Sequence, residues 1–142
     1  MTKRTSEAQW EGNLKDGKGR FWTASGEVSG VYTHGTRFEE RQGTNPEELI
    51  GAAHAGCFSM ALAADLEKAG YAPESVRTVA AVTLRRGEGG YDITGVELDA
   101  QAQVPGIEES EFLRIAEGAK VGCPVSKALA AVPIQLQASL VG

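Results

Sequence analysis

Cysteine is scarce in this chain of 142 residues, and the shortage excludes several kinds of site. Only Cys57 and Cys123 are present, too few for a disulfide-stapled secreted scaffold or an all-cysteine zinc site. The two histidines, His34 and His54, create no recognisable zinc spacing with them. We therefore expect no metal ion and no cofactor. The chemistry left to two cysteines alone is redox chemistry.

The chain also lacks an excess of positive charge. It carries 14 Lys and Arg side chains against 19 Asp and Glu, for a net charge of -5. A protein that binds nucleic acid electrostatically needs clustered cations to displace the counterions of the phosphates. The composition therefore predicts no nucleic-acid partner.

Long apolar runs are missing as well. The first twenty residues contain no stretch that could form the core of a signal peptide, so we expect a cytoplasmic protein. The longest nearly apolar stretch, residues 49–64, is shorter than the ~20 residues of a membrane-spanning helix and contains His54 and Ser59. It predicts a buried helix and no membrane partner.

What remains is the composition of an ordinary globular protein, with 42% hydrophobic and 23% charged residues. A chain of this length buries roughly two-thirds of the surface of its unfolded form in one compact body. We therefore expect a single domain over residues 1–142.

The first half of the chain contains a turn-rich region followed by a long predicted helix. Seven glycines fall among short aromatic and β-branched stretches in the first third, which favours a meander of short antiparallel strands. At residues 43–48 the pattern changes, because Thr44 or Asn45 can cap a helix and Pro46 suits its first position. This helix is predicted to run to about Lys68 and to end at Gly70.

The second half alternates strands and helices. Residues 75–86 and 91–104 predict a long β-hairpin around the turn at 87–90. Helices are predicted over about 108–120 and 124–130, followed by a half-buried strand in VPIQLQASLV at 132–141. Segregated strands and helices of this kind indicate an α+β fold, with antiparallel β-sheets and a long, buried central helix.

Each cysteine has a structural and a functional interpretation. Cys57 lies within the long helix among small apolar residues, where a cysteine is often an inert core residue. Cys123 stands between Gly122 and Pro124 at a helix junction, where free backbone N–H groups can stabilise a thiolate. A capping or packing role for Cys123 is an equally fair interpretation.

The polar candidates near them have similar alternatives. His54 could act as a base for Cys57 or provide half of a metal site. Glu47 and Glu48 could simply be partners of the helix dipole, and Arg37 could be a surface cation after a strand. The residues alone leave these alternatives open.

Five segments together resemble the OsmC/Ohr family of osmotically inducible and organic hydroperoxide resistance proteins. They are TRF at 36–38, GTNPEEL at 43–49, AAHAGCFSMAL at 52–62, VPGI at 104–107 and GCPVS at 122–126. The sequences of the long helix and of the GCPVSKAL segment are similar to those of the OsmC branch. The resemblance spans essentially the whole chain, in order and in length.

The resemblance implies a thiol-dependent peroxidase that forms an intertwined homodimer and reduces organic hydroperoxides. By position, Cys57 would be the peroxidatic cysteine and Cys123 the resolving one. Arg37 would be the cation that activates the thiolate, and Glu47 the carboxylate that holds the arginine. An external dithiol would reduce the Cys57–Cys123 disulfide, and the resemblance implies a dithiol of the lipoyl type.

Elementary electrostatics is consistent with these roles. The attacking sulfur must be a thiolate, whereas an apolar helix environment raises the pKa of a thiol. Arg37 can compensate because a guanidinium stays charged when desolvated and can bind several groups with its planar fork. Glu47 would orient that fork and make the arginine easier to bury.

The spacing of Glu47 and Cys57 raises a geometric problem. Ten residues on a straight helix correspond to about 15 Å of rise and a rotation of about 280°. Either the helix breaks, near Gly51, or the Arg37–Glu47 pair reaches Cys57 from a second subunit. The small residues of this helix allow another helix to approach closely, so we favour a dimer with a composite site.

Two other classes of function compete with a peroxidase. In the first, a redox sensor or stress protein, the Cys57–Cys123 disulfide would change conformation or partner binding without significant turnover. In the second, a structural or small-molecule binding domain, both cysteines would simply be buried. In that case the two sulfur atoms would lie too far apart to bond.

Overall fold

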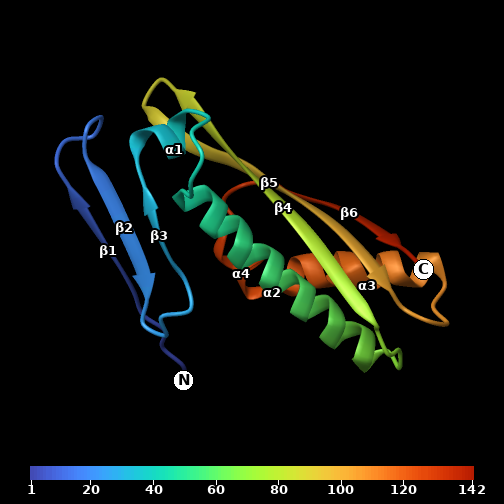
Figure 1. Cartoon of the computed structure of the whole chain (residues 1–142). Helices are drawn as coiled ribbons and strands as arrows, with labels where there is room; N and C mark the ends of the chain where they lie inside the picture. Colours follow the sequence, from blue (N-terminus) through green and yellow to red (C-terminus); the bar gives the residue numbers. More distant parts are fainter. The chain divides into compact units, whose positions relative to one another are not determined.

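The structure, a computed structural model, describes all of residues 1–142 and separates into two compact units (Figure 1). The first unit is Met1–Leu49 and the second is Ile50–Gly142. Each unit contains a three-stranded sheet, and helices follow in both, as the predicted α+β class requires. The prediction of a single domain stays a prediction.

The first unit begins with the predicted meander. Strands β1 (Ser6–Glu11), β2 (Lys18–Thr23) and β3 (Ser29–Tyr32) pair antiparallel in sequence order. Gly19 lies beneath the rings of Trp10 and Tyr32, whose centroids are 5.6 Å apart, and a Cβ there would come within 2.7 Å of both side chains. The glycine therefore lets two aromatic rings from β1 and β3 meet across β2.

A short helix that the sequence did not predict follows the meander. Helix α1 (His34–Phe38) begins with a capping box, in which Thr33 and Thr36 each accept the other's backbone N–H. Threonine takes the place of the usual Glu or Gln in this box. The usual capping-box residues are therefore absent from the sequence, although the hydrogen bonds of this box position α1 and with it Arg37.

Helix α2 (Pro46–Lys68) has the predicted bounds. Asn45 provides the cap, because its Oδ1 accepts the backbone N–H of Glu48 at 2.8 Å. Gly70 follows the helix with a φ of +94°, a left-handed conformation that favours glycine. Both ends of α2 could therefore be predicted from the residues next to them.

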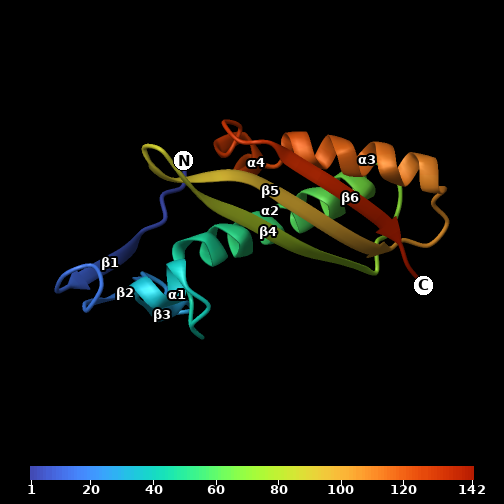
Figure 2. The same ribbon diagram turned by 90° about the horizontal axis from the view of Figure 1, so that it is seen from above.

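The second unit carries the predicted hairpin and the last strand. Strands β4 (Ser75–Gly87) and β5 (Gly90–Gln103) pair antiparallel. Strand β6 (Ile134–Leu140) lies along β5 but runs parallel to it, so this sheet is mixed and the prediction of purely antiparallel sheets was wrong (Figure 2). Helices α3 (Glu109–Gly122) and α4 (Pro124–Ala128) follow β5 and precede β6 in the sequence. They provide the long crossover connection that parallel pairing of β5 and β6 requires.

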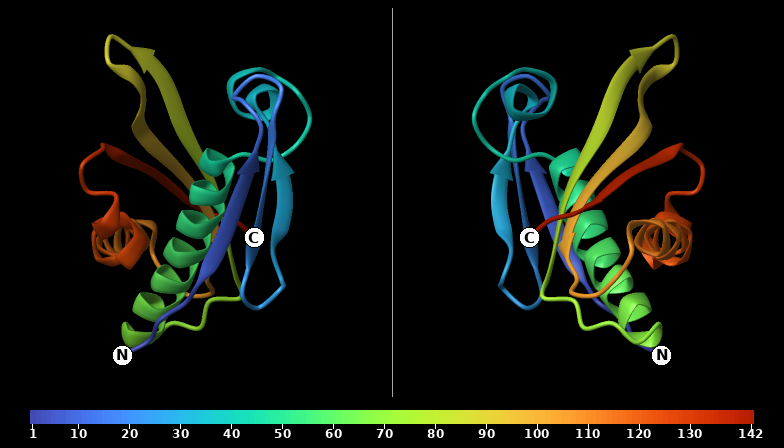
Figure 3. Two further views of the ribbon diagram at one scale, coloured as in Figure 1. Left: turned by 90° about the vertical axis from the view of Figure 1, so that its left-hand side faces the viewer. Right: turned by 90° about the vertical axis from the view of Figure 1, so that its right-hand side faces the viewer.

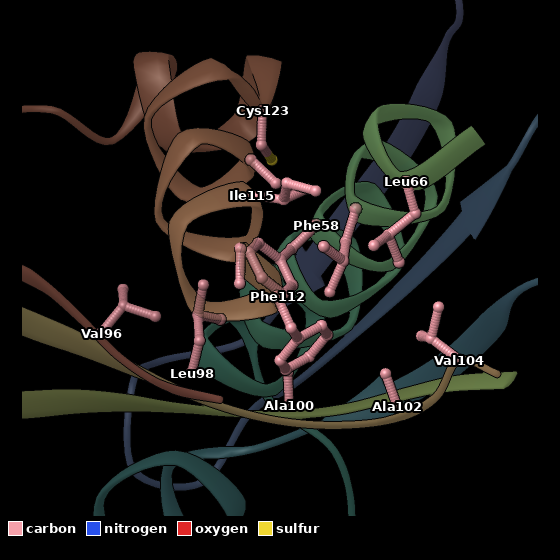
Figure 4. Packing of buried hydrophobic residues seen from close by; sticks show 13 residues of the cluster. Phe58, Leu66, Val96, Leu98, Ala100, Ala102, Val104, Phe112, Ile115 and Cys123 are labelled. Atoms are coloured by element: carbon pink, nitrogen blue, oxygen red, sulfur yellow. The ribbon is translucent and has the colours of Figure 1, made fainter. Parts of the chain in front are cut away.

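Helices α2 and α3 lie on the same side of this sheet (Figure 3). The core between them contains Phe58, Leu62 and Leu66 of α2, Phe112 of α3 and alternate residues of β5 (Figure 4). All four of these named side chains are fully buried. Burial on β5 alternates because successive strand residues point to opposite faces.

The prediction of a buried helix holds for only one face of α2. Its buried residues recur at a spacing of three or four, as one helical stripe, whereas Met60 is 77% exposed. By length and hydropathy α2 could also span a membrane, so length alone did not exclude that function. The packed stripe of α2, with a buried histidine, is instead that of a core helix.

We predict that Leu66→Ala lowers the free energy of unfolding by about 2–5 kcal/mol, because it leaves a cavity between α2 and the sheet. Leu113→Ala is the matched control, since Leu113 on α3 is 42% exposed, and its cost should stay below about 1 kcal/mol. Urea unfolding at one fixed protein concentration measures both changes. Equal losses for the two variants would contradict this assignment of the core.

Candidate functional site

The structure brings the two cysteines together. Cys57 lies on α2 and is partly exposed, while Cys123 is fully buried between α3 and α4. Their Sγ atoms are 2.9 Å apart, and both are free thiols. Cys57 and Cys123 are 66 residues apart in the sequence but in contact in the structure, so a disulfide can form between them without unfolding. This removes one condition of the hypothesis that both cysteines are inert.

Backbone geometry at the helix junction places Cys123. It ends α3 and also caps α4, with φ −58° and ψ 125°, and Pro124 occupies the first position of α4. Its backbone N–H donates to Ala119 O and its carbonyl accepts from Lys127 N, so both helices hold it. Hydrogen bonds from both helices therefore fix the backbone of Cys123 at their junction.

The surroundings of the two sulfurs shift their proton affinities in opposite directions. Burial raises the pKa of Cys57, the interaction with Cys123 raises it further, and the Val125 N–H opposes this only in part. Burial also acts to raise the pKa of Cys123, but Cys57, Ser126 and Val125 together lower it. We conclude that the groups around this pair favour the thiolate on Cys123, and that Cys57 needs a further cation to become one.

Arg37 and Glu47 form the ion pair that the sequence predicted. The Nε and Nη2 atoms of Arg37 each donate to one oxygen of Glu47 at 3.0 Å, a bidentate arrangement. The Glu47 side chain is only 9% exposed and that of Arg37 is 35% exposed. Asn45 Nδ2 donates to Thr36 O at 3.0 Å and ties the loop between α1 and α2 together. A half-buried guanidinium is thus held in one orientation.

Helix α2 continues without interruption through Gly51, so the helix break considered there as one of two alternatives does not occur. A Cβ on Gly51 would lie 3.3 Å from the Ala80 carbonyl oxygen, which shows that this glycine lets α2 approach β4 closely. Its role is helix–sheet packing rather than helix breaking. The uninterrupted helix removes one of the two explanations for the Glu47–Cys57 spacing, and the composite site of a dimer stays a prediction.

A buried polar pair that the sequence did not predict lies beside the cysteines. His54 is fully buried, and its Nε2 is 2.7 Å from the Oγ of Ser126, which is 5% exposed. His54 Nδ1 is the one buried side-chain nitrogen or oxygen without a hydrogen-bond partner. The spacing of His54 with Phe58 and Leu62 could have shown that it faces the core, but nothing local indicated Ser126.

Two large apolar side chains that follow Cys57 on α2 belong to the core. Phe58 and Leu62 have no exposed surface. Met60 is largely exposed, on a different face of α2. Of these three side chains, only Met60 is accessible from outside the chain.

His54 gives a prediction for stability against pH. Burial lowers the pKa of His54, whereas an unfolded histidine titrates near ~6.5. Below that pH the unfolded chain binds a proton that the native chain resists, so stability falls as the pH falls. Between pH 7.5 and 5.5 the loss should reach up to about 1.4 kcal/mol, and His54→Gln should remove it. Urea unfolding at both pH values tests this, and equal pH dependence in the two proteins would contradict it.

The chain is similar to known proteins of one family. The family model described as "OsmC-like protein" matches residues 38–137, which include Glu47, Cys57 and Cys123 and begin one residue after Arg37. Peroxiredoxin OsmC of Escherichia coli (strain K12) is 50% identical over 129 residues, which cover 90% of each chain.

Two solved structures have the same fold. One is an organic hydroperoxide resistance protein OsmC from Legionella pneumophila, with a TM-score of 0.72, 25% identity and 97% of each chain covered. The other is an organic hydroperoxide resistance protein from Elizabethkingia anophelis, with a TM-score of 0.73, 26% identity, and 99% of this chain and 98% of that chain covered. With the family model and the relative of 50% identity, these findings lead to one conclusion: the chain belongs to the OsmC-like protein family.

Proposed function

We propose that this protein is a cysteine-based peroxidase that reduces organic hydroperoxides, and hydrogen peroxide more weakly. The observation that carries the proposal is the 2.9 Å approach of the Cys57 and Cys123 sulfur atoms. The name of the Escherichia coli relative, a peroxiredoxin, supports the reaction type. The names of the two structural relatives support the class of substrate.

Cys57 is the sulfur that attacks. It is partly exposed, whereas Cys123 is fully buried, so a peroxide from solvent reaches Cys57 first. The Cys57 thiolate bonds to the terminal peroxide oxygen and the O–O bond breaks. The other oxygen leaves as an alkoxide, which takes up the proton released when the Cys57 thiol ionised and becomes an alcohol. Cys57 becomes a sulfenic acid.

Cys123 then resolves the sulfenic acid. Its sulfur bonds to the Cys57 sulfur, the S–O bond breaks, and the hydroxyl leaves as water with the proton of the Cys123 thiol. An external dithiol, which we propose to be of the lipoyl type, reduces the disulfide by thiol exchange and completes the cycle. Such a cycle fits the cytoplasm, where thiols are kept reduced.

Arg37 supplies the cation that Cys57 lacks. Its guanidinium lowers the pKa of the attacking thiol and stabilises the negative charge on the departing oxygen. Glu47 holds the guanidinium through its two 3.0 Å hydrogen bonds. The pair is preorganised before substrate binds, which spares the site the cost of ordering an arginine at that moment.

We propose further that a second copy of the chain brings this pair to Cys57 in an intertwined homodimer. Helix α2 exposes small or flexible apolar residues on one side: Ala53, Gly56, Met60 and Ala64. A Cβ on Gly56 would meet no atom within 4 Å, so nothing in this chain fills the space beside it. Small residues at this spacing permit close packing of two helices, and the continuous α2 supports a partner as the source of the Arg37–Glu47 pair.

We predict that Cys57→Ser lowers turnover by at least about 10³-fold, since the nucleophile is lost. Cys123→Ser should still consume one equivalent of peroxide in a single turnover but should form no intrachain disulfide. A steady-state assay with cumene hydroperoxide, hydrogen peroxide and a lipoyl dithiol, together with mass spectrometry, measures both. Stoichiometric oxidation of the wild-type protein without turnover would favour a redox sensor instead.

Subunit mixing tests the composite site. Arg37→Ala and Cys57→Ser should each be nearly inactive, with a loss of about 10²-fold or more. When the two variants are unfolded and refolded together in equal amounts, half of the dimers are hybrids with one complete site. About a quarter of wild-type activity should then return. No recovery, with hybrid dimers demonstrated by mass spectrometry, would show that the arginine does not act across the subunits.

A further inference from the structure

The hydrogen bonds between Arg37 and Glu47 leave one motion of the guanidinium free. They fix one edge of the guanidinium against the carboxylate. Hydrogen bonds tolerate a broad range of directions at a carboxylate oxygen, so the guanidinium plane can still rotate about the line that joins the two oxygens. A contact on the face of the guanidinium would remove this freedom.

Phe38 makes such a contact. The guanidinium carbon of Arg37 lies over the Phe38 ring, 5.2 Å from its centroid. This distance is within the ~6 Å at which the negative face of an aromatic ring attracts a cation. Helix α1 ends at Phe38, and the backbone is extended from Glu39 onward. The contact therefore lies at the end of the helix that carries Arg37.

The Phe38 ring is itself held by the preceding turn of α1. His34 lies four residues earlier, the spacing at which helical side chains are neighbours. The centroids of the two rings are 5.0 Å apart and their planes are tilted by 52°. The Nδ1 atom of His34 is in turn 3.6 Å from Oε1 of Glu39. A ring packed in this way presents a fixed surface to the guanidinium.

The orientation of the guanidinium plane decides where its remaining donors point. A guanidinium has five N–H donors, and Glu47 accepts two of them, so three remain. The Arg37 side chain is 35% exposed, which makes these donors accessible. In the proposed cycle they must face the Cys57 sulfur and the departing oxygen, because both carry negative charge.

We propose that Phe38 is a positioning residue, which holds the plane of the Arg37 guanidinium through a cation–π contact so that its free N–H donors face the Cys57 sulfur and the peroxide. Glu47 fixes one edge of the guanidinium and Phe38 fixes one face. In this role the ring acts through Arg37 and does not contact the reacting atoms. The inference rests on the proposed function, since Phe38 matters only if Arg37 assists Cys57.

The test weakens the cation–π contact without changing the shape of the site. Phe38 is replaced by phenylalanine analogues with one, two or three ring fluorines, introduced by stop-codon suppression. Fluorine withdraws electrons from the ring face and weakens its attraction for a cation. It also makes the ring more hydrophobic, so a role in packing alone would not weaken with each added fluorine.

The rate of Cys57 oxidation is measured in a single turnover with cumene hydroperoxide and, separately, with hydrogen peroxide. We expect the rate to fall with each fluorine, by about three- to tenfold over the series, and equally for both peroxides. The pKa of the Cys57 thiol, measured from the pH dependence of its alkylation, should rise in step. A loss with cumene hydroperoxide alone would overturn the proposal, because it would show that the ring is an apolar wall for the substrate.

Natural substitutions test the same contact through Arg37. Phe38→Leu keeps an apolar side chain without a π face and should lose about three- to tenfold in the oxidation rate, whereas Phe38→Tyr should stay within about twofold of wild type. In an Arg37→Ala background, Phe38→Leu should cause no further loss. A further loss of the same size would show that Phe38 does not act through Arg37.

Trp22→Leu is the matched control. The guanidinium carbon of Arg20 lies 5.9 Å from the centroid of the Trp22 ring on β2, so this substitution removes a similar contact in the same unit. The rate of Cys57 oxidation should not change. Slowing as large as that of Phe38→Leu would overturn the proposal, since it would reflect a general loosening of the first unit.

The outcomes separate this inference from the proposed function. An unchanged rate over the fluorine series, with Cys57→Ser inactive, would overturn the role of Phe38 and leave the peroxidase in place. Full activity of Cys57→Ser would overturn the peroxidase itself. If Phe38→Leu does not fold, the fluorinated proteins test the same contact, and an unchanged rate in them is equally decisive against it.

Discussion

The approach of two sulfur atoms to 2.9 Å is the constraint around which the second unit is organised. Cys57 is fixed by α2, whose buried stripe packs against the mixed sheet, and Cys123 is fixed by the junction of α3 and α4. Any shift of α2 along its axis would move Cys57 by about 1.5 Å per residue of slippage. The large buried side chains Phe58 and Phe112 resist such a shift, because a close-packed core leaves them no other place.

The same packing creates the electrostatic problem that the rest of the site must solve. The neighbouring donors favour the thiolate on Cys123 although burial raises its pKa, whereas Cys57 is the more exposed sulfur. In the proposed mechanism a cation reverses this order, and the Arg37 guanidinium, held by two hydrogen bonds to Glu47, is the cation proposed for that role.

Much of the fold could be predicted because its signals are local. Pro46, Asn45 and Gly70 mark the ends of α2 through backbone preferences that act within a few residues. The direction of β6 could not be predicted, because alternation in its sequence shows a strand with one buried face but not the strand that it pairs with. The packing role of Gly51 could not be predicted for a similar reason, since its close contact with Ala80 arises only when α2 lies on β4.

The sequence by itself determined the element order, the family and the residues able to do redox chemistry, since these depend on residue type and short-range spacing. The tertiary structure determined which of these residues come into contact. Cys57 and Cys123 are 66 residues apart and His54 and Ser126 are 72 apart, so only the packing of α2 against α4 could bring each pair into contact. The bidentate geometry of Arg37 and Glu47 likewise depended on α1, a helix whose threonine capping box carried no familiar pattern. Contacts between distant residues depend on how whole faces pack, and no local preference encodes that choice.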